Sequence, residues 1–272
     1  MLRIGLSSSA LLTRDLRAVL DAAKGAGVDA VEWAGDVHVP HDDPAAAQAA
    51  MMDTLRSGLT VASYATLYRA SAEGEAGLRF ERVLDAAAAL QAPLVRVYLG
   101  PAPRAGGRRP AARDGERLAA EARRLGDLAA ARGLTLCLSF GRNTSLDSYP
   151  AALALVERID HPFVRLAWEP LQGVPSAEAS AALEACAPRL SMLVARRLDR
   201  DGAPLSLAGE ADAWRRRLAA FSAAQADPKM GSFVVIGAVR DGAGRVGASL
   251  PGLAEDVALL RGIIGELEAP GR

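Results

Sequence analysis

The sequence feature that most constrains the fold is a regular alternation of short apolar segments with longer segments of helical period. The short segments have the length of buried strands and lie at residues 2–7, 30–33, 60–64, 94–99, 135–140, 164–168, 191–195 and 233–239. The longer segments lie at residues 15–26, 44–57, 77–90, 114–132, 146–159, 176–187, 211–224 and 253–267. Strict alternation favours parallel strands joined by right-handed crossovers. Eight such units in 272 residues predict an α/β fold with a single (β/α)8 barrel domain over residues 1–272.

Glycine marks several of the joins between these segments. Gly27, Gly58 and Gly133 each follow a helical segment and precede an apolar one. Glycine at such a place adopts the left-handed conformation that ends a helix and turns the chain. One longer loop, PAPRAGGRRP at residues 101–110, opens the fourth helical segment. We expect this loop to lie over the mouth of the barrel and to be among the more mobile segments, because it has no apolar anchor.

The charge balance narrows the classes of partner. The chain has 32 lysines and arginines and 32 aspartates and glutamates, so its formal net charge is zero. Nucleic acids and acidic membranes usually require a basic excess, so we expect neither, and a small-molecule ligand or substrate is the expected partner. Homodimer formation stays open. The first residues lack the pattern of a signal peptide and no segment resembles a membrane span, so we expect a soluble cytoplasmic protein.

Residues that commonly bind metals are few. Cys137 and Cys186 lie far apart in apolar segments, so we expect reduced, buried thiols and no disulfide. His161 precedes a strand segment, at the end of the barrel opposite the mouth, where a structural role is expected. His38 and His41 form an HxxH pattern with aspartates nearby. Such a pattern can bind a metal, but it is more typical of a solvated polar loop.

Four segments resemble the xylose-isomerase-like TIM barrels of the sugar phosphate isomerase/epimerase superfamily. Residues 30–43, AVEWAGDVHVPHDD, resemble the second strand and its loop. Residues 58–69, GLTVASYATLYR, resemble the third strand, and residues 92–100, APLVRVYLG, resemble the fourth. Residues 143–170 resemble the fifth loop, the fifth helix and the sixth strand. The resemblance extends over nearly the whole chain and implies the barrel fold and its pocket more specifically than any one reaction.

The resemblance also implies a divalent ion, held by side chains at the ends of strands five to eight. This sequence departs from that pattern. Ser139 and Gly141 stand where the family has a glutamate and a histidine, Val194 stands near the usual histidine, and Gly237 stands near the usual glutamate. Glu169 is the ligand position that keeps a carboxylate. We therefore expect a divergent member that has lost most of the usual metal ligands, with no metal and no other cofactor.

The polar residues at the strand ends form the expected site. Arg196 lies two residues after Val194 and so shares its face of the strand. A buried carboxylate without a cation must pair with an arginine or hold a proton, and burial raises its pKa toward the range of a general acid or base. For Glu32, structural pairing with Arg96 is the alternative. The candidate catalytic residues are Glu169, Glu32 and Arg196, and the candidate substrate-binding residues are Trp33, His38, Tyr64, Tyr68, Arg96, Arg142, Asn143 and Trp168.

Three functions are compatible with this set. The first is a metal-independent acid/base enzyme, of the isomerase/epimerase type or a lyase or cyclase derived from it. Its substrate would be a small, polar, anionic metabolite, and an arginine would replace the metal as the electrophile. The second is a non-catalytic barrel that binds a metabolite or a protein partner. The third is a metal-dependent sugar isomerase or epimerase with a rearranged site.

Overall fold

The computed structural model describes residues 1–70, 78–100, 112–139, 144, 148–225, 232–239 and 250–269. The strands of this part of the chain pair in chain order, each parallel to the next, and the eighth pairs with the first. They are β1 (Leu2–Ser7), β2 (Ala30–Ala34), β3 (Thr60–Ala70), β4 (Leu94–Leu99), β5 (Thr135–Ser139), β6 (Val164–Trp168), β7 (Leu190–Ala195) and β8 (Ser232–Ile236). The closed (β/α)8 barrel expected from the alternation is confirmed.

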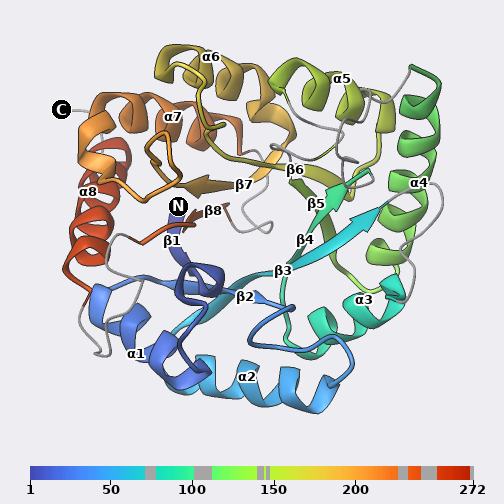
Figure 1. Ribbon diagram of the computed structural model, residues 1–272, viewed down its shortest axis with the longest axis horizontal. Coiled ribbons are helices and arrows are strands. Elements are labelled where there is room, and N and C mark those ends of the chain that lie inside the picture. The colour runs from blue at the N-terminus through green and yellow to red at the C-terminus, as the bar shows by residue number, and fades with distance from the viewer. Residues whose placement is uncertain are drawn as a thin grey trace.

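The helices form a ring around this barrel (Figure 1). They are α1 (Leu16–Ala26), α2 (Pro44–Arg56), α3 (Phe80–Ala89), α4 (Ala112–Ala130), α5 (Tyr149–Ile159), α6 (Ser176–Cys186), α7 (Ala211–Ala224) and α8 (Pro251–Glu268). There are also three short 3-10 helices in this part of the chain. After β1 comes η1 (Ser8–Leu11), after α6 comes η2 (Ala187–Arg189), and after the loop that follows β7 comes η3 (Leu207–Glu210). Each strand is thus backed by a helix, and the loops after the strands meet at one end of the barrel.

The helix ends follow the local sequence signals. Gly27, Gly58 and Gly133 have φ angles of 76°, 77° and 69°, which are left-handed as the sequence predicts. At the other end of two helices, the carboxylates of Asp15 and Asp43 accept the backbone N–H three residues further on, at 2.8 and 2.9 Å. These side chains satisfy amide groups that have no partner within the helix. Local chemistry therefore sets the ends of the elements that position the site.

β3 differs most from its predicted bounds. The strand continues to Ala70, six residues beyond the predicted end, and its pairing with β4 is irregular between Ala65 and Arg69. The second half of the strand contains Thr66, Tyr68 and Arg69, a polar composition that is more typical of a loop. Thr66 and Tyr68 are nevertheless buried. Burial of alternate residues keeps the segment extended, and this tertiary effect outweighs local composition.

Small and apolar side chains fill the inside of the barrel. They form a cluster of their own, separate from the larger core between the sheet and the helices. Its members are Ala30, Ala62, Leu94, Cys137, Ala167, Met192, Val194, Phe233 and Val235. The barrel is therefore a packed core with no pore. Polar side chains gather beyond this cluster, at the carboxyl ends of the strands, and that is where a ligand can enter.

The two cysteines are free and buried, as expected. Burial raises the pKa of Cys137 to about 12 and that of Cys186 to about 11, so neither forms a thiolate at neutral pH. In the described part of the chain, no helix has the length and apolar character needed to cross a membrane. The loop at residues 101–110, for which mobility is expected, lies outside the described residues.

Candidate functional site

The ends of β1, β2 and β3 bring a carboxylate and two hydroxyl groups into one row. Ser7 pairs with Glu32 across β1 and β2, and Glu32 pairs with Ser63 across β2 and β3. Paired residues of neighbouring strands point to the same face of a sheet. The hydroxyl groups of Ser7 and Ser63 therefore reach Glu32 from both sides, and each donates to one carboxylate oxygen at 2.7 Å.

Arg96 on β4 completes the contacts of Glu32, which is fully buried. The Nε and Nη2 atoms of Arg96 donate to the two carboxylate oxygens of Glu32 at 2.8 and 2.7 Å. Nη1 of Arg96 donates to Ser139 Oγ at 3.0 Å. Burial acts to raise the pKa of Glu32, but Arg96 and the two serines outweigh it and hold the pKa below its ordinary value. Each oxygen accepts two hydrogen bonds, so Glu32 is a stable anion. The structure therefore shows the pairing of Glu32 with Arg96, the alternative to a catalytic role that the sequence left open.

Glu169, directly after β6, has a different environment. Its side chain is slightly more open than that of Glu32, with 12% exposed, and among the described residues its carboxylate makes one ion pair, from Oε1 to Arg196 Nη2 at 3.2 Å. Burial raises the pKa of Glu169, and the opposing charges of Arg196 and Arg96 do not outweigh it. The carboxyl group therefore holds its proton more tightly than an ordinary glutamate does. This behaviour suits a group that takes up and returns a proton.

The two acidic residues belong to one electrostatic field. Arg96, which is bonded to Glu32, also lowers the pKa of Glu169, while the negative charge of Glu32 raises it. Arg196 is partly open to solvent, with 26% of its side chain exposed. Its Nε is buried and has no hydrogen-bond partner among the described residues. The mouth of the barrel thus contains a carboxyl group of raised pKa beside a guanidinium with an unused donor.

Four aromatic candidates are buried against neighbouring helices and loops. Trp33 and Trp168 are fully buried, as is Tyr64, and Tyr68 is 3% exposed. Trp33 Nε1 donates to Thr54 of α2 at 3.0 Å, and Trp168 stacks on Tyr149 of α5. Tyr64 donates to the carbonyl oxygen of Val39 at 2.7 Å, and Tyr68 packs against Phe80 of α3. These contacts tie the four side chains to helices and loops around the barrel.

The two histidines of the HxxH pattern point to different partners. His38 Nε2 lies 2.9 Å from the carbonyl oxygen of Arg14, and His41 Nδ1 lies 2.9 Å from the hydroxyl group of Tyr64. His41 Nε2 also contacts Asp36 Oδ1 at 3.2 Å. Among the described residues no group of three histidine, cysteine, aspartate or glutamate side chains is placed to hold a metal ion. The candidates Arg142 and Asn143 lie outside the described residues.

The other strand ends offer few ligand atoms. Ser139 is buried, and its hydroxyl group accepts the hydrogen bond from Arg96. Val194 is buried in the apolar cluster inside the barrel. A Cβ atom added at Gly237 would overlap Cγ1 of Val194, so the valine side chain fills the space that a side chain on β8 would need. Of these strand-end positions, Glu169 alone presents a carboxylate.

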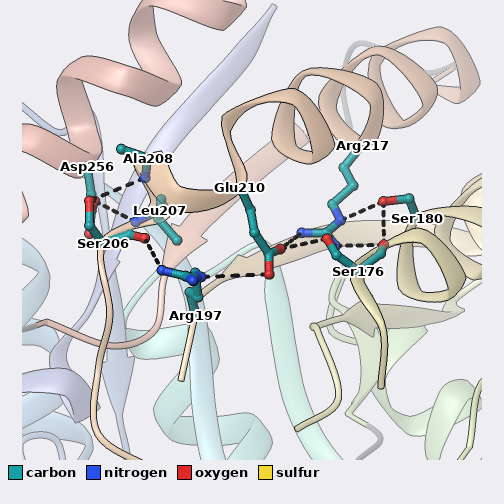
Figure 2. A network of polar contacts seen from close by, with 9 residues as sticks. All are labelled: Ser176, Ser180, Arg197, Ser206, Leu207, Ala208, Glu210, Arg217 and Asp256. Carbon is teal, nitrogen blue, oxygen red and sulfur yellow. Dashed lines mark hydrogen bonds and ion pairs between the residues drawn. The ribbon is translucent and has the colours of Figure 1, made fainter. Parts of the chain in front are cut away.

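A second polar cluster, which the sequence did not predict, lies beside Arg196. A pocket of about 80 Å³ between the loop after β6 and the loop after β7 is lined by Gln172, Ser176, Arg196, Arg197, Glu210 and Arg217, together with apolar residues. We call it the side pocket. Glu210 lies between Arg197 and Arg217, as Figure 2 shows. The signal in the sequence is that Arg217 shares the buried face of α7 with Trp214, Leu218 and Phe221, where an apolar residue is usual.

The fold and the mouth define a (β/α)8 barrel with an acid–guanidinium pair at the carboxyl ends of its strands. Residues 20–232 match the family described as "Xylose isomerase-like TIM barrel". The match covers most of the chain, so the protein belongs to this family. A search of curated protein sequences found no match.

Solved structures show the same fold at low sequence identity. A xylose isomerase-like TIM barrel/4-hydroxyphenylpyruvate dioxygenase fusion protein has 18% identity and a TM-score of 0.72, over 98% of this chain and 43% of the fusion. A xylose isomerase-like TIM barrel protein from Mycobacterium smegmatis, in complex with magnesium, has 17% identity and a TM-score of 0.66, over 97% of each chain. D-psicose 3-epimerase from Clostridium cellulolyticum H10, with D-tagatose, has 16% identity and a TM-score of 0.68, over 98% of this chain and all of the epimerase.

Proposed function

We propose that this protein is an acid/base enzyme of the isomerase/epimerase type, or a lyase or cyclase derived from it, that acts on a small, polar, anionic metabolite. The observation that carries the proposal is the environment of Glu169. The carboxyl group is buried at the mouth of the barrel, has a raised pKa and is paired, within the described part of the chain, with Arg196 at 3.2 Å. Such a combination of burial, charge and position is typical of functional carboxyl groups.

Glu169 and Arg196 have complementary roles in this proposal. An isomerase or epimerase removes a proton from a carbon beside a carbonyl group and returns it at another position or face. Glu169 accepts that proton, and its raised pKa favours holding the proton until it is returned. Arg196 stabilises the negative charge that develops on the substrate oxygen, because its side chain is 26% exposed at the mouth and a guanidinium stays charged. Glu32 keeps Arg96 in place and transfers no proton.

We further propose that this chemistry proceeds without a divalent ion at the usual strand-end position. A divalent ion there needs several oxygen or imidazole ligands. The described residues at the ends of β5, β7 and β8 do not fit that need, since Ser139 is hydrogen-bonded to Arg96, Val194 is apolar and its side chain fills the space beside Gly237. The guanidinium of Arg196 beside Glu169 supplies positive charge in the same region.

The test measures proton exchange, so the product of the reaction does not have to be identified first. The full chain is incubated in D₂O with a panel of small hydroxy acids, oxo acids, sugars and sugar phosphates, and NMR follows the entry of deuterium at carbon. We expect exchange on one class of compound, unchanged by EDTA, and a loss of roughly 10²–10⁴ in rate for Glu169→Gln. Asp42→Asn, which removes a carboxylate from an exposed loop, is the control. Exchange that persists in Glu169→Gln, or that EDTA abolishes, would contradict the proposal.

A further inference from the structure

The side pocket continues the proposed site in one direction. Arg196 lines the pocket and at the same time pairs with Glu169, so the two spaces share a side chain. On the far side the pocket reaches Ser176 at the start of α6 and Arg217 of α7. A molecule whose reacting carbon lies at Glu169 can therefore place a second group in the pocket. The volume of about 80 Å³ suits a compact group such as a carboxylate or a phosphate.

The pocket has an excess of positive charge. Arg196, Arg197 and Arg217 contribute three guanidinium groups, whereas Glu169 and Glu210 are the two carboxylates of the described residues that pair with them. Glu210 divides its charge between two arginines, at 3.1 Å from Arg217 Nη1 and 3.7 Å from Arg197 Nε. One positive charge of this set is therefore not balanced when both carboxylates are ionised. If Glu169 holds a proton, the excess grows by one.

The donors on this side are fixed in place. Arg217 is 1% exposed, and its guanidinium lies over the rings of both Trp168 and Trp214, at 5.3 and 4.9 Å from the ring centres. It donates to Ser180 Oγ at 3.1 Å and to Ser176 Oγ at 2.9 Å, as Figure 2 shows. These contacts hold Arg217 rigidly, and Arg217 in turn holds Glu210. Positioning of this kind reduces the side-chain entropy that the protein loses when a ligand binds.

Arg196 and Arg197 keep donors for a ligand. Arg197 Nη1 donates to the carbonyl oxygen of Ser206 at 3.3 Å, and the ion pair of Arg197 with Glu210 is long. Both side chains line the pocket and are partly exposed, Arg196 at 26% and Arg197 at 32%. Planar guanidinium groups bind carboxylate and phosphate oxygens through paired N–H donors. The pocket thus offers two accessible guanidinium groups on neighbouring residues of one loop.

We propose that the side pocket binds the oxyanion of the substrate, a carboxylate or a phosphate, and so places the neighbouring carbon at Glu169. The identification of the bound group as part of a substrate rests on the proposed function, whereas anion binding itself does not. Arg197 is the specificity-determining residue in this arrangement, because it lines the pocket without contacting Glu169. Glu210 limits the affinity for anions, since its carboxylate lines the pocket.

Calorimetric titration of the full chain with inorganic phosphate, and separately with acetate, tests this inference at constant ionic strength. We expect millimolar or tighter binding of at least one probe, and the tighter probe identifies the type of anion. Arg197→Met should weaken binding roughly tenfold, which is the value of one charge-assisted hydrogen bond. The matched control is Arg216→Met, which removes the same charge from an exposed position on α7 and should change affinity less than twofold. Glu210→Gln should strengthen binding.

Absence of saturable binding of both probes, or equal effects of Arg197→Met and Arg216→Met, would overturn the inference. Melting temperatures recorded for all variants show whether each is folded. If Arg197→Met does not fold, Arg197→Lys is measured in its place. The inference is then overturned if neither Arg197→Lys nor Glu210→Gln changes the affinity for the anion. Glu169→Gln should still bind the probe. If anions bind as expected but Glu169→Gln still exchanges deuterium fully, the proposed function is refuted and the pocket is not. If Glu169→Gln loses exchange but anion binding does not depend on Arg197, the pocket is refuted and the proposed function is not.

Discussion

Glu32 and Glu169 lie at the carboxyl ends of strands in the same barrel, and both are buried, but their surroundings differ. Glu32 accepts four hydrogen bonds, two from Arg96 and one each from Ser7 and Ser63. Glu169 has, among the described residues, one ion-pair contact, with the half-buried Arg196. The pKa of Glu32 is accordingly lowered and that of Glu169 is raised. A glutamate is thus a hydrogen-bonded anion on one side of the mouth, and on the other side a glutamate holds its proton more tightly than usual.

This difference shows that burial alone does not decide the role of an acidic residue. Burial disfavours the charged form of both carboxyl groups. The number and geometry of the donors around each carboxylate decide whether that effect is overcome. A carboxylate whose oxygens are fully hydrogen-bonded stabilises the fold and has no lone pair for a ligand. A carboxyl group with few donors destabilises the fold, and such a residue is retained where it serves a function.

The largest expected effect comes from removing the arginine on the structural side. Arg96→Met leaves the buried carboxylate of Glu32 without its cation, and it also leaves Ser139 without its donor. Breaking a buried ion pair in this way destabilises a protein by about 3–5 kcal/mol. Arg196→Met removes a partly exposed arginine, so we expect a loss of less than about 1 kcal/mol. Urea denaturation of both variants measures the difference, and equal losses would contradict it.

Replacing the two acidic residues themselves should affect stability differently. Glu32→Gln removes the charge that Arg96 needs, and we expect a loss of about 1–3 kcal/mol at neutral pH. Glu169→Gln removes a charge that burial disfavours, so its melting temperature should equal or exceed that of the unmodified protein. Differential scanning calorimetry at pH 7 compares the two. A Glu169→Gln protein that melts as early as Glu32→Gln would show that Glu169 is a structural residue.

A smaller effect is the dependence of these differences on pH. The folded-state pKa of Glu32 is lowered, so its stabilisation is present above the unfolded pKa and is lost as pH falls through the folded pKa. The folded-state pKa of Glu169 is raised, so its destabilisation appears only as pH rises above the ordinary value of 4.5. Near pH 4.5, Glu32→Gln should therefore still be less stable than the unmodified protein by most of the difference seen at pH 7. Glu169→Gln should by then have lost most of any gain in stability. Denaturation curves at several pH values check this, and parallel behaviour of the two variants would contradict it.

The sequence predicts the barrel well because its signals are local and repeated. Apolar segments of strand length, helices between them, and glycine caps such as Gly27 all agree with one another. The approach of Glu169 to Arg196 also follows from the sequence, because both are placed at the ends of strands that a barrel brings together. Alternation of side chains along β7 then directs Arg196 toward the mouth.

Other parts of the site depend on information that the sequence does not carry. Trp33 and Trp168 lie next to Glu32 and Glu169 in the chain, and a shift of one residue in a strand changes the face of the sheet on which a side chain lies. The structure places both tryptophans toward the helices. The contribution of Arg217 to the side pocket also depends on how α6 packs on α7, since its partners Ser176 and Ser180 lie in α6.

The pKa values of the two carboxyl groups test the central comparison most directly. Carbon-13 labelling of the glutamate side chains allows each carboxyl group to be followed by NMR through a pH titration, and the Glu32→Gln and Glu169→Gln variants assign the two signals. We expect the signal of Glu169 to titrate above 4.5 and that of Glu32 to titrate below it. A pKa of Glu169 at or below the ordinary value, or one equal to that of Glu32, would contradict the account.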